Sequence, residues 1–102
     1  MIFATHSQMS EKEYQNAVVR AFLDYGWKVY HTFDSRRSEP GFPDLVMVKG
    51  KRIVFVELKS AKGKETTAQL EWLDALDKAD TKIVDVWRPE SSDGEIIRLL
   101  RL

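Results

Sequence analysis

Two short runs near the middle of the chain, residues 43–48 and 53–59, are mostly apolar, and the polar segment 49–52 between them contains a glycine. Such runs around a glycine-containing turn predict a β-hairpin. Side chains of a strand alternate between its two faces, so Glu57 and Lys59 share one face of the second strand. The hairpin therefore carries two charged side chains on one side of an otherwise apolar strand.

A third charged residue, Asp44, joins this face when the hairpin is aligned. Pairing Val48 with Ile53 places Asp44 directly opposite Glu57, and opposed residues have Cβ atoms about 4.5–5.5 Å apart. Two carboxylates at that distance repel each other and destabilise the sheet. A divalent cation between them would convert the repulsion into coordination, because hard Mg²⁺ prefers carboxylate oxygens. The pattern favours a metal site; charged residues that simply emerge into solvent at strand ends are the alternative.

A capping box that begins at Ser10 predicts a helix over residues 11–25, ended by Gly26 in the left-handed conformation. Two polar residues one turn apart, Glu11 and Gln15, fall within the apolar arc of this helix. Polar side chains aimed at a core need partners. Glu11 has a simpler explanation in its place in the first turn, where acids suit the helix dipole. Gln15 lies deeper and is a stronger candidate for a site residue.

A second helix is expected to begin at Thr66, which forms another capping box with Gln69. Gln69 also falls inside the apolar arc of this helix. Two interpretations of Gln69 therefore stay open, one as a cap of the helix and one as a member of the site at the hairpin.

Residues 27–33 and 82–87 predict two further strands, and residues 95–102 are expected to add a short edge strand. The core elements follow the order α-β-β-β-α-β. The hairpin strands are apolar on both faces apart from the charged residues, so both faces of the sheet must be covered. The predicted fold is an α/β fold, a three-layer α/β/α sandwich with a mixed central sheet and one helix on each face.

The composition predicts one domain over residues 10–102, preceded by a flexible leader of residues 1–9. Cysteine is absent, which excludes a disulfide framework and thiolate metal ligands. No apolar run approaches the roughly 20 residues of a membrane span, so we expect a cytoplasmic protein with no membrane partner. The 16 basic and 16 acidic residues balance, which argues against coating nucleic acid by bulk charge but leaves room for a local basic surface.

Two basic segments could supply such a surface. The first is the loop that leads to Asp44, with Ser35, Arg36, Arg37 and Ser38. Arginines and hydroxyls beside a metal site are the groups that contact phosphate. The second segment contains Lys62 and Lys64. For both segments, an exposed polar loop without a binding role is the alternative.

These residues resemble the PD-(D/E)xK nuclease superfamily and, within it, the VRR-NUC domain. Residues 43–44 match the PD element, and residues 57–59 match the ExK element. The likeness extends over roughly residues 10–89. The further matching segments are Ser10-Glu11 with Gln15, residues 34–38 and 41–46, Gln69 with Trp72-Leu73, and residues 86–89.

The resemblance implies a restriction-endonuclease-like fold and a hydrolase acting on ester bonds, a DNA endonuclease dependent on Mg²⁺ or Mn²⁺. Stand-alone phage and bacterial VRR-NUC domains are similar to Holliday-junction resolvases, which act on branched DNA as homodimers, so the resemblance also implies a homodimer. We expect Asp44 and Glu57 to bind metal together with the backbone carbonyl of Leu58. Lys59 would position the attacking water or stabilise the transition state.

The same likeness implies roles for residues outside the hairpin. Glu11 or Gln15 would complete the catalytic site from the first helix, and Gln69 would orient a ligand or touch a phosphate. Arg36 and Arg37 would hold the DNA strand. Two other functions stay open. The domain could be a catalytically weak module that binds DNA and recruits partners, or a scaffold whose acids pair with Lys59 and Arg52 and bind no metal.

Overall fold

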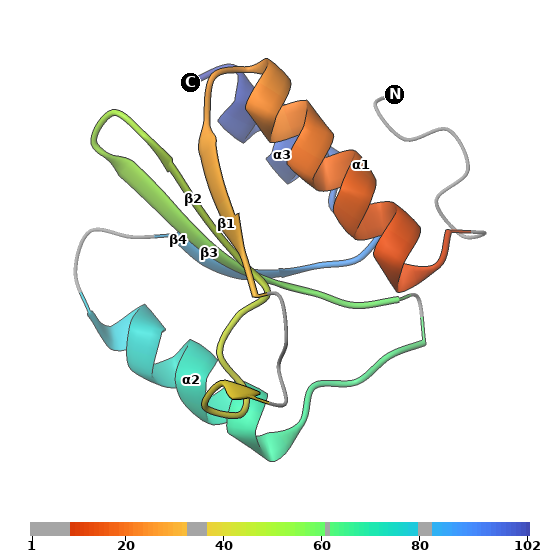
Figure 1. The fold of residues 1–102 in the computed structure, drawn as a ribbon, viewed down its shortest axis with the longest axis vertical. Coiled ribbons are helices and arrows are strands. Elements are labelled where there is room, and N and C mark those ends of the chain that lie inside the picture. Colours follow the sequence, from red (N-terminus) through yellow and green to blue (C-terminus); the bar gives the residue numbers. More distant parts are fainter. Residues whose placement is uncertain (1–8, 33–36, 61, 80–82) are drawn as a thin grey trace.

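The structure of the protein is a computed structural model, and it describes residues 9–32, 37–60, 62–79 and 83–102. Three helices and four strands make up the described part of the chain (Figure 1). In chain order they are α1 (Glu11–Asp24), β1 (Lys28–His31), β2 (Leu45–Lys49), β3 (Arg52–Leu58), α2 (Thr67–Lys78), β4 (Ile83–Trp87) and α3 (Asp93–Leu100). No helix among these residues is long and apolar enough to cross a membrane.

The four strands form one sheet in the order β1-β2-β3-β4. Antiparallel pairing joins β1 to β2 and β2 to β3, whereas β3 and β4 run parallel, so the sheet is mixed as predicted. Val48 pairs with Ile53, which confirms the predicted register of the hairpin. The pairing ends where Leu45 meets Val56. Asp44 and Glu57 are the next residues outward along the two strands.

Helices cover both faces of the sheet, which confirms the three-layer α/β/α fold (Figure 1). The helices α1 and α3 lie on one face, and α2 lies on the other. The main core fills the space between the sheet and the α1/α3 layer. Its buried side chains are Tyr14, Val18, Phe22, Trp27, Leu45, Met47, Val54, Val56, Leu58, Trp87, Ile96, Leu99 and Leu100.

Aromatic rings from three segments pack together on the α2 face of the sheet. The ring of Phe42, in the loop before β2, meets Phe55 of β3 edge to face at 6.3 Å between ring centroids. The same ring meets Trp72 of α2 at 5.1 Å. This packing holds α2 and the loop before β2 against the same part of the sheet.

The prediction of a short edge strand over residues 95–102 is wrong, because residues 95–100 belong to α3. Ile96, Leu99 and Leu100 recur at helical spacing and are buried in the main core. On the exposed side, Arg98 and Glu95 form an ion pair one turn apart. The expectation of one helix per face is therefore also wrong, since the α1 face carries two.

Capping determines where α1 begins. The Glu13 N–H donates to Ser10 Oγ at 3.1 Å, and the Ser10 N–H donates to Glu13 Oε1 at 3.0 Å, which confirms the capping box. The helix ends at Asp24, one residue earlier than predicted, and Gly26 follows with φ of +87°. The expected leader lies outside the described residues except for Met9, which packs against the core.

Candidate active site

The structure brings Asp44 and Glu57 together at one end of the hairpin. Asp44 Oδ2 accepts a hydrogen bond of 2.9 Å from the Leu58 N–H, so the Asp44 side chain reaches across to β3 beyond the last strand pair. The Asp44 carbonyl accepts a bond of 3.0 Å from the Thr32 N–H, which ties the same residue to the segment after β1. Asp44 is therefore fixed from both neighbouring strands, with its carboxylate beside Glu57.

Glu57 is almost completely buried, with 1% of its surface exposed. Burial raises the pKa of its carboxyl group most, the charge of Asp44 raises it further, and Lys59 opposes both, with a resulting pKa of about 8. Glu57 Oε1 has no hydrogen-bond partner within the part of the chain that the structure describes. Without a cation, this carboxyl group therefore holds its proton at neutral pH.

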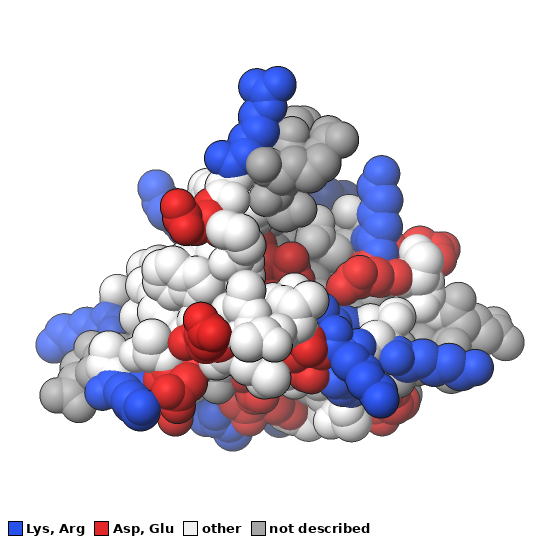
Figure 2. All heavy atoms as spheres, turned by 90° about the horizontal axis from the view of Figure 1, so that it is seen from below, with Lys and Arg blue, Asp and Glu red and all other residues white. Residues whose placement is uncertain are grey.

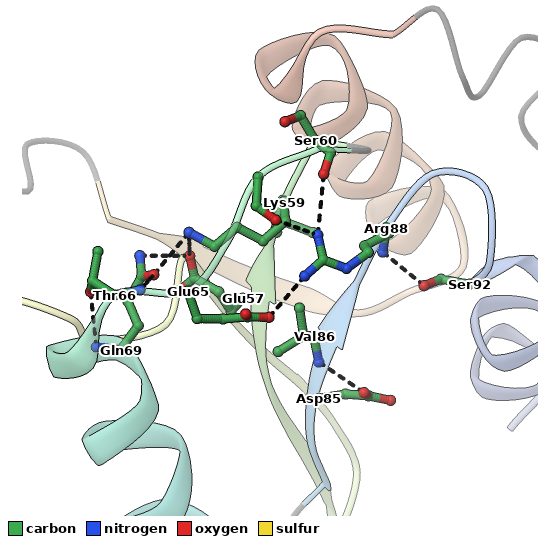
Figure 3. Close-up of polar contacts among 12 residues, drawn as sticks. Glu57, Lys59, Ser60, Glu65, Thr66, Gln69, Asp85, Val86, Arg88 and Ser92 are labelled. Carbon is green, nitrogen blue, oxygen red and sulfur yellow. Dashed lines mark hydrogen bonds and ion pairs between the residues drawn. The ribbon is translucent and has the colours of Figure 1, made fainter.

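Lys59 and Gln69 complete a triangle of contacts with Glu57 (Figure 3). Gln69 Nε2 donates to Glu57 Oε2 at 3.0 Å, and Lys59 Nζ lies 3.4 Å from the same oxygen. Lys59 Nζ also donates to Gln69 Oε1 at 2.8 Å. Lys59 is itself buried, with 8% of its surface exposed. The positive charge is thus held at one position beside the two acids.

Gln69 owes its orientation to the capping box of α2. Its Oε1 accepts a bond of 2.8 Å from the Thr66 N–H, and its own N–H donates to Thr66 Oγ1 at 3.2 Å. The structure therefore confirms the capping box. It also brings Gln69 into contact with the hairpin residues, whereas a functional role of Gln69 stays a prediction. The cap at the start of α2 points the Gln69 amide toward Glu57 and Lys59.

The loop that leads into Asp44 packs on the start of α2 through Gly41. This glycine has φ of +91°, and a Cβ atom added to it would lie 2.4 Å from the backbone carbon of Ala68 and 2.7 Å from the Gln69 nitrogen. Only glycine allows such an approach without a shift of the backbone. Gly41 thereby sets the distance between the strand that carries Asp44 and the helix that carries Gln69.

Arg88, directly after β4, holds the described residues of the loop that follows Lys59 (Figure 3). These are residues 60 and 62–65, called the 60–65 loop below. Arg88 Nη1 donates to the carbonyls of Ser60 at 3.2 Å and Gly63 at 2.8 Å, and its Nη2 donates to Glu65 Oε1 at 3.0 Å. Sequence analysis did not identify Arg88 as a site residue. Its partners are 23 to 28 positions away in the sequence, and no local pattern signals such contacts.

The two candidates on α1 differ in their relation to the acids. Glu11 is exposed at the start of the helix; partial burial raises its pKa most, followed by the charge of Asp44, while Lys59 lowers it. Gln15 is half-buried and lines a surface pocket with residues of α1 and His31. Among the described hydrogen bonds, none joins Gln15 to the acids. The electrostatic coupling favours Glu11 as the α1 residue that faces the site.

The predicted DNA-binding residues are placed in part. Ser35 and Arg36 lie outside the described residues, whereas Arg37 and Ser38 are exposed. Lys62 and Lys64 are exposed on the loop that Arg88 holds. Figure 2 shows basic and acidic side chains intermixed on the side of the molecule that carries α2. Any attraction of phosphate to this side would therefore come from particular loops rather than from a uniform basic surface.

The donor groups at the site suit a hard cation. In the described ranges no group of three or more His, Cys, Asp or Glu side chains is placed to hold a metal. A cation at this site would therefore have two side-chain ligands, the carboxylates of Asp44 and Glu57. Glu57 Oε1 is a buried oxygen without a hydrogen-bond donor in the described part of the chain, which a cation would satisfy. Carboxylate oxygens are the ligands that Mg²⁺ and Mn²⁺ prefer. The residues present therefore fit a divalent metal.

Comparison with known proteins gives a sequence match and matches in fold, two of which are described below. The sequence matches the VRR-NUC domain family over residues 4–86. A solved structure described as a VRR_NUC domain has a TM-score of 0.67 and 22% identity, covering 89% of this chain and 94% of that one. A Holliday junction resolvase from Archaeoglobus fulgidus has a TM-score of 0.51 and 16% identity, covering 72% of this chain and 65% of the resolvase. No curated protein matches the sequence.

Proposed function

Because this chain belongs to the VRR-NUC domain family, we propose that it is a divalent-metal-dependent endonuclease that hydrolyses phosphodiester bonds in DNA. VRR-NUC domains are nuclease domains. The observation that carries the proposal is the buried carboxyl group of Glu57 beside Asp44, with an oxygen that lacks a donor among the described residues and a pKa raised to about 8. A carboxyl group with a raised pKa, placed beside a second acid and a fixed lysine, is typical of a catalytic site.

In this proposal, Asp44 and Glu57 hold Mg²⁺ or Mn²⁺, with the backbone carbonyl of Leu58 as a further ligand. When bound, such an ion supplies a more acidic water molecule and offsets negative charge on the scissile phosphate. Asp44 is already oriented for this role by its bond to the Leu58 N–H. Glu57 releases its proton when it becomes a ligand, because coordination requires the carboxylate.

Lys59 provides the second positive charge of the proposed site. Its Nζ donates to Gln69 Oε1, so Lys59 would keep this partner if the Glu57 carboxylate bound a cation. A fixed ammonium group beside the phosphate stabilises the negative charge that develops during hydrolysis. Gln69 keeps Lys59 in place and contacts Glu57 with its amide nitrogen. Glu11, whose pKa responds to the charge of Asp44, completes the site from α1.

Branched DNA, such as a Holliday junction, is the substrate that we propose, and the protein would act on it as a homodimer. Support comes from the fold, which resembles that of an archaeal Holliday junction resolvase. Paired cuts across a junction need two sites, and a two-fold symmetric dimer supplies them. Arg36 and Arg37, together with the exposed lysines of the 60–65 loop, would contact the phosphate backbone.

Cleavage assays on matched linear, flapped and four-way DNA, with Mg²⁺ or Mn²⁺ and with chelator, test this proposal. We expect metal-dependent cleavage that is fastest on the four-way substrate. Asp44→Asn and Glu57→Gln should abolish cleavage while the fold persists, and Glu71→Gln, at an exposed site on α2, should leave it unchanged. Full activity of either carboxylate variant would overturn the assignment. DNA binding by the wild type without cleavage would replace it with the recruitment module.

A further inference from the structure

We propose that Arg88 is a positioning residue of the active site, because it fixes the loop that connects Lys59 to Gln69. The inference rests on the proposed nuclease function and extends it to a residue outside the acid pair and its lysine. Arg88 directly follows β4, and Lys59 directly follows the neighbouring strand β3, which contains Glu57. The proposal concerns how its guanidinium group acts on the neighbouring loop.

The guanidinium group makes three contacts with the 60–65 loop. It donates to two backbone carbonyls, those of Ser60 and Gly63, and to the carboxylate of Glu65. The side chains of Arg88 and Glu65 are 27% and 22% exposed, so this ion pair is more shielded than a pair on the open surface. A planar group with several fixed donors suits this set of acceptors, whereas the single ammonium group of lysine cannot reach all three.

Both ends of this loop adjoin residues of the proposed site. Ser60 directly follows Lys59, whose N–H donates to the Trp87 carbonyl at 3.2 Å. Glu65 directly precedes Thr66, whose N–H donates to Gln69 Oε1. A shift of the loop would therefore move the lysine from one side and the glutamine from the other. Because these two residues contact each other and Glu57, their relative placement decides the geometry of the triangle.

The backbone around Arg88 is anchored to the rest of the fold. The Arg88 backbone N–H donates to Ser92 Oγ at 2.9 Å, and Ser92 is buried immediately before α3. The preceding residue, Trp87, is 1% exposed in the main core and stacks on Phe22. The loop is thus tied to the sheet and to the α3 layer. Pre-organisation of this kind removes an ordering cost when the reaction begins.

Arg88 is better placed for this role than for direct contact with DNA. Its guanidinium donors are directed at acceptors of the protein, and most of its surface is covered. The exposed cations of the same loop are Lys62 and Lys64. Removal of Arg88 should therefore slow cleavage without weakening DNA binding, whereas removal of the two lysines should weaken binding.

The test compares Arg88→Lys with the matched control Arg98→Lys. Arg98 also contacts a glutamate through two nitrogens, at 2.8 and 3.1 Å, but on the exposed side of α3. We expect Arg88→Lys to lower the single-turnover cleavage rate on four-way DNA about tenfold or more, with the Kd for DNA within about twofold of wild type. Arg98→Lys should change neither. A cleavage rate of Arg88→Lys near that of wild type, or a raised Kd at an unchanged rate, would overturn the proposal.

Amide hydrogen exchange provides a readout that does not depend on activity. The N–H groups of Gly63 and Thr66 are bonded within the loop and to Gln69, respectively. In Arg88→Lys, both should exchange about tenfold faster, while amides of α1 keep their protection. Unchanged exchange at both amides would overturn the proposal. If the wild type cleaves no DNA, the proposed function fails, and the exchange result still decides whether Arg88 holds the loop.

A second variant and a double mutant separate positioning from general stability. Glu65→Gln removes the negative charge of the ion pair and keeps the two carbonyl contacts of Arg88, so we expect the cleavage rate to fall about threefold. In a Gln69→Ala background, Arg88→Lys should reduce the cleavage rate by a clearly smaller factor than in the wild type. The reason is that both changes disturb the same contacts among Glu57, Lys59 and Gln69. Arg88 would have a purely structural role if the losses of cleavage rate were fully additive. The same conclusion would follow if Arg88→Lys were inactive because it unfolds at the assay temperature while Glu65→Gln stayed fully active.

Discussion

Replacing Glu57 by Gln should make the metal-free protein more stable at neutral and alkaline pH. The folded protein binds the Glu57 proton up to a pKa of about 8, whereas the unfolded chain releases it above the ordinary value of 4.5. Between these values the folded state binds more protons, so its free energy of unfolding falls as the pH rises. Glutamine has the shape of the protonated acid and no charge to desolvate. The fall of unfolding free energy with rising pH that Glu57 causes should therefore be absent from the variant.

The size of the effect follows from the two pKa values. One unit of pKa shift corresponds to about 1.4 kcal/mol. With pKa values of 4.5 when unfolded and about 8 when folded, the wild type should lose roughly 3–4 kcal/mol of unfolding free energy between about pH 5 and pH 8 from this group alone. The difference between Glu57→Gln and wild type should widen by that amount over the same interval.

Urea denaturation in the presence of chelator, at several pH values in this interval, measures the difference. Titrating groups distant from Glu57 affect wild type and variant alike, so their contributions cancel when the two curves are subtracted. Glu71→Gln is the matched control, because Glu71 is exposed on α2, and its curve should run parallel to that of wild type. A constant difference between Glu57→Gln and wild type across the interval would refute the reasoning. A variant less stable than wild type at the alkaline end would refute it as well.

Three further changes test the parts around the acid pair. In urea denaturation, Gly41→Ala should lower the free energy of unfolding by at least about 2 kcal/mol more than Gly26→Ala does. Both glycines have positive φ, but only at Gly41 would an added Cβ atom lie within 3 Å of backbone atoms. Equal losses of stability would contradict the packing of Gly41 on α2. Lys62→Ala with Lys64→Ala should lower the slope of log Kd against log salt by about 2, and an unchanged slope would remove these lysines from the DNA contact. Gln69→Ala should slow cleavage about tenfold or more, while an undiminished rate would restrict Gln69 to its capping role.

The hairpin and both capped helices could be predicted because their signals are local. The alternation of residues 53–59 favours one register, because a slip by one residue would turn Glu57 and Lys59 toward the main core in place of Val54, Val56 and Leu58. Capping boxes at Ser10 and Thr66 lie within four residues of sequence. The position of Asp44 beside Glu57 followed from the register alone. This part of the fold needed no knowledge of distant contacts.

The C-terminal segment was mispredicted because a short apolar run fits both a strand and a helix. The spacing of Ile96, Leu99 and Leu100 is that of a helical face, and the Glu95–Arg98 pair adds a helical signal. The choice is decided by packing: these side chains fill the core beside α1. A segment of this length has little preference of its own, so tertiary contacts determine its structure.

The side chains that the structure brings together at the candidate site were predicted where they lie along a strand, but the contacts of Arg88 with a loop were not. Asp44, Glu57 and Lys59 follow from the pattern of two strands. Arg88 acts through backbone carbonyls of a loop, and a carbonyl has no residue type that a sequence could reveal. The choice between Glu11 and Gln15 likewise depended on where the start of α1 lies relative to Asp44, which the helix pattern alone does not give.

Calorimetric titration of the metal-free protein with Mn²⁺ tests most directly whether Asp44 and Glu57 form a metal site. Titrations at about pH 7 in two buffers with different ionisation enthalpies give both the affinity and the protons released. Because the pKa of Glu57 is raised to about 8, the wild type should release close to one proton per ion bound. Asp44→Asn and Glu57→Gln should lose most of the binding, and Glu71→Gln should retain it. A wild type that binds no Mn²⁺, or carboxylate variants that bind it as well as the wild type does, would contradict the account.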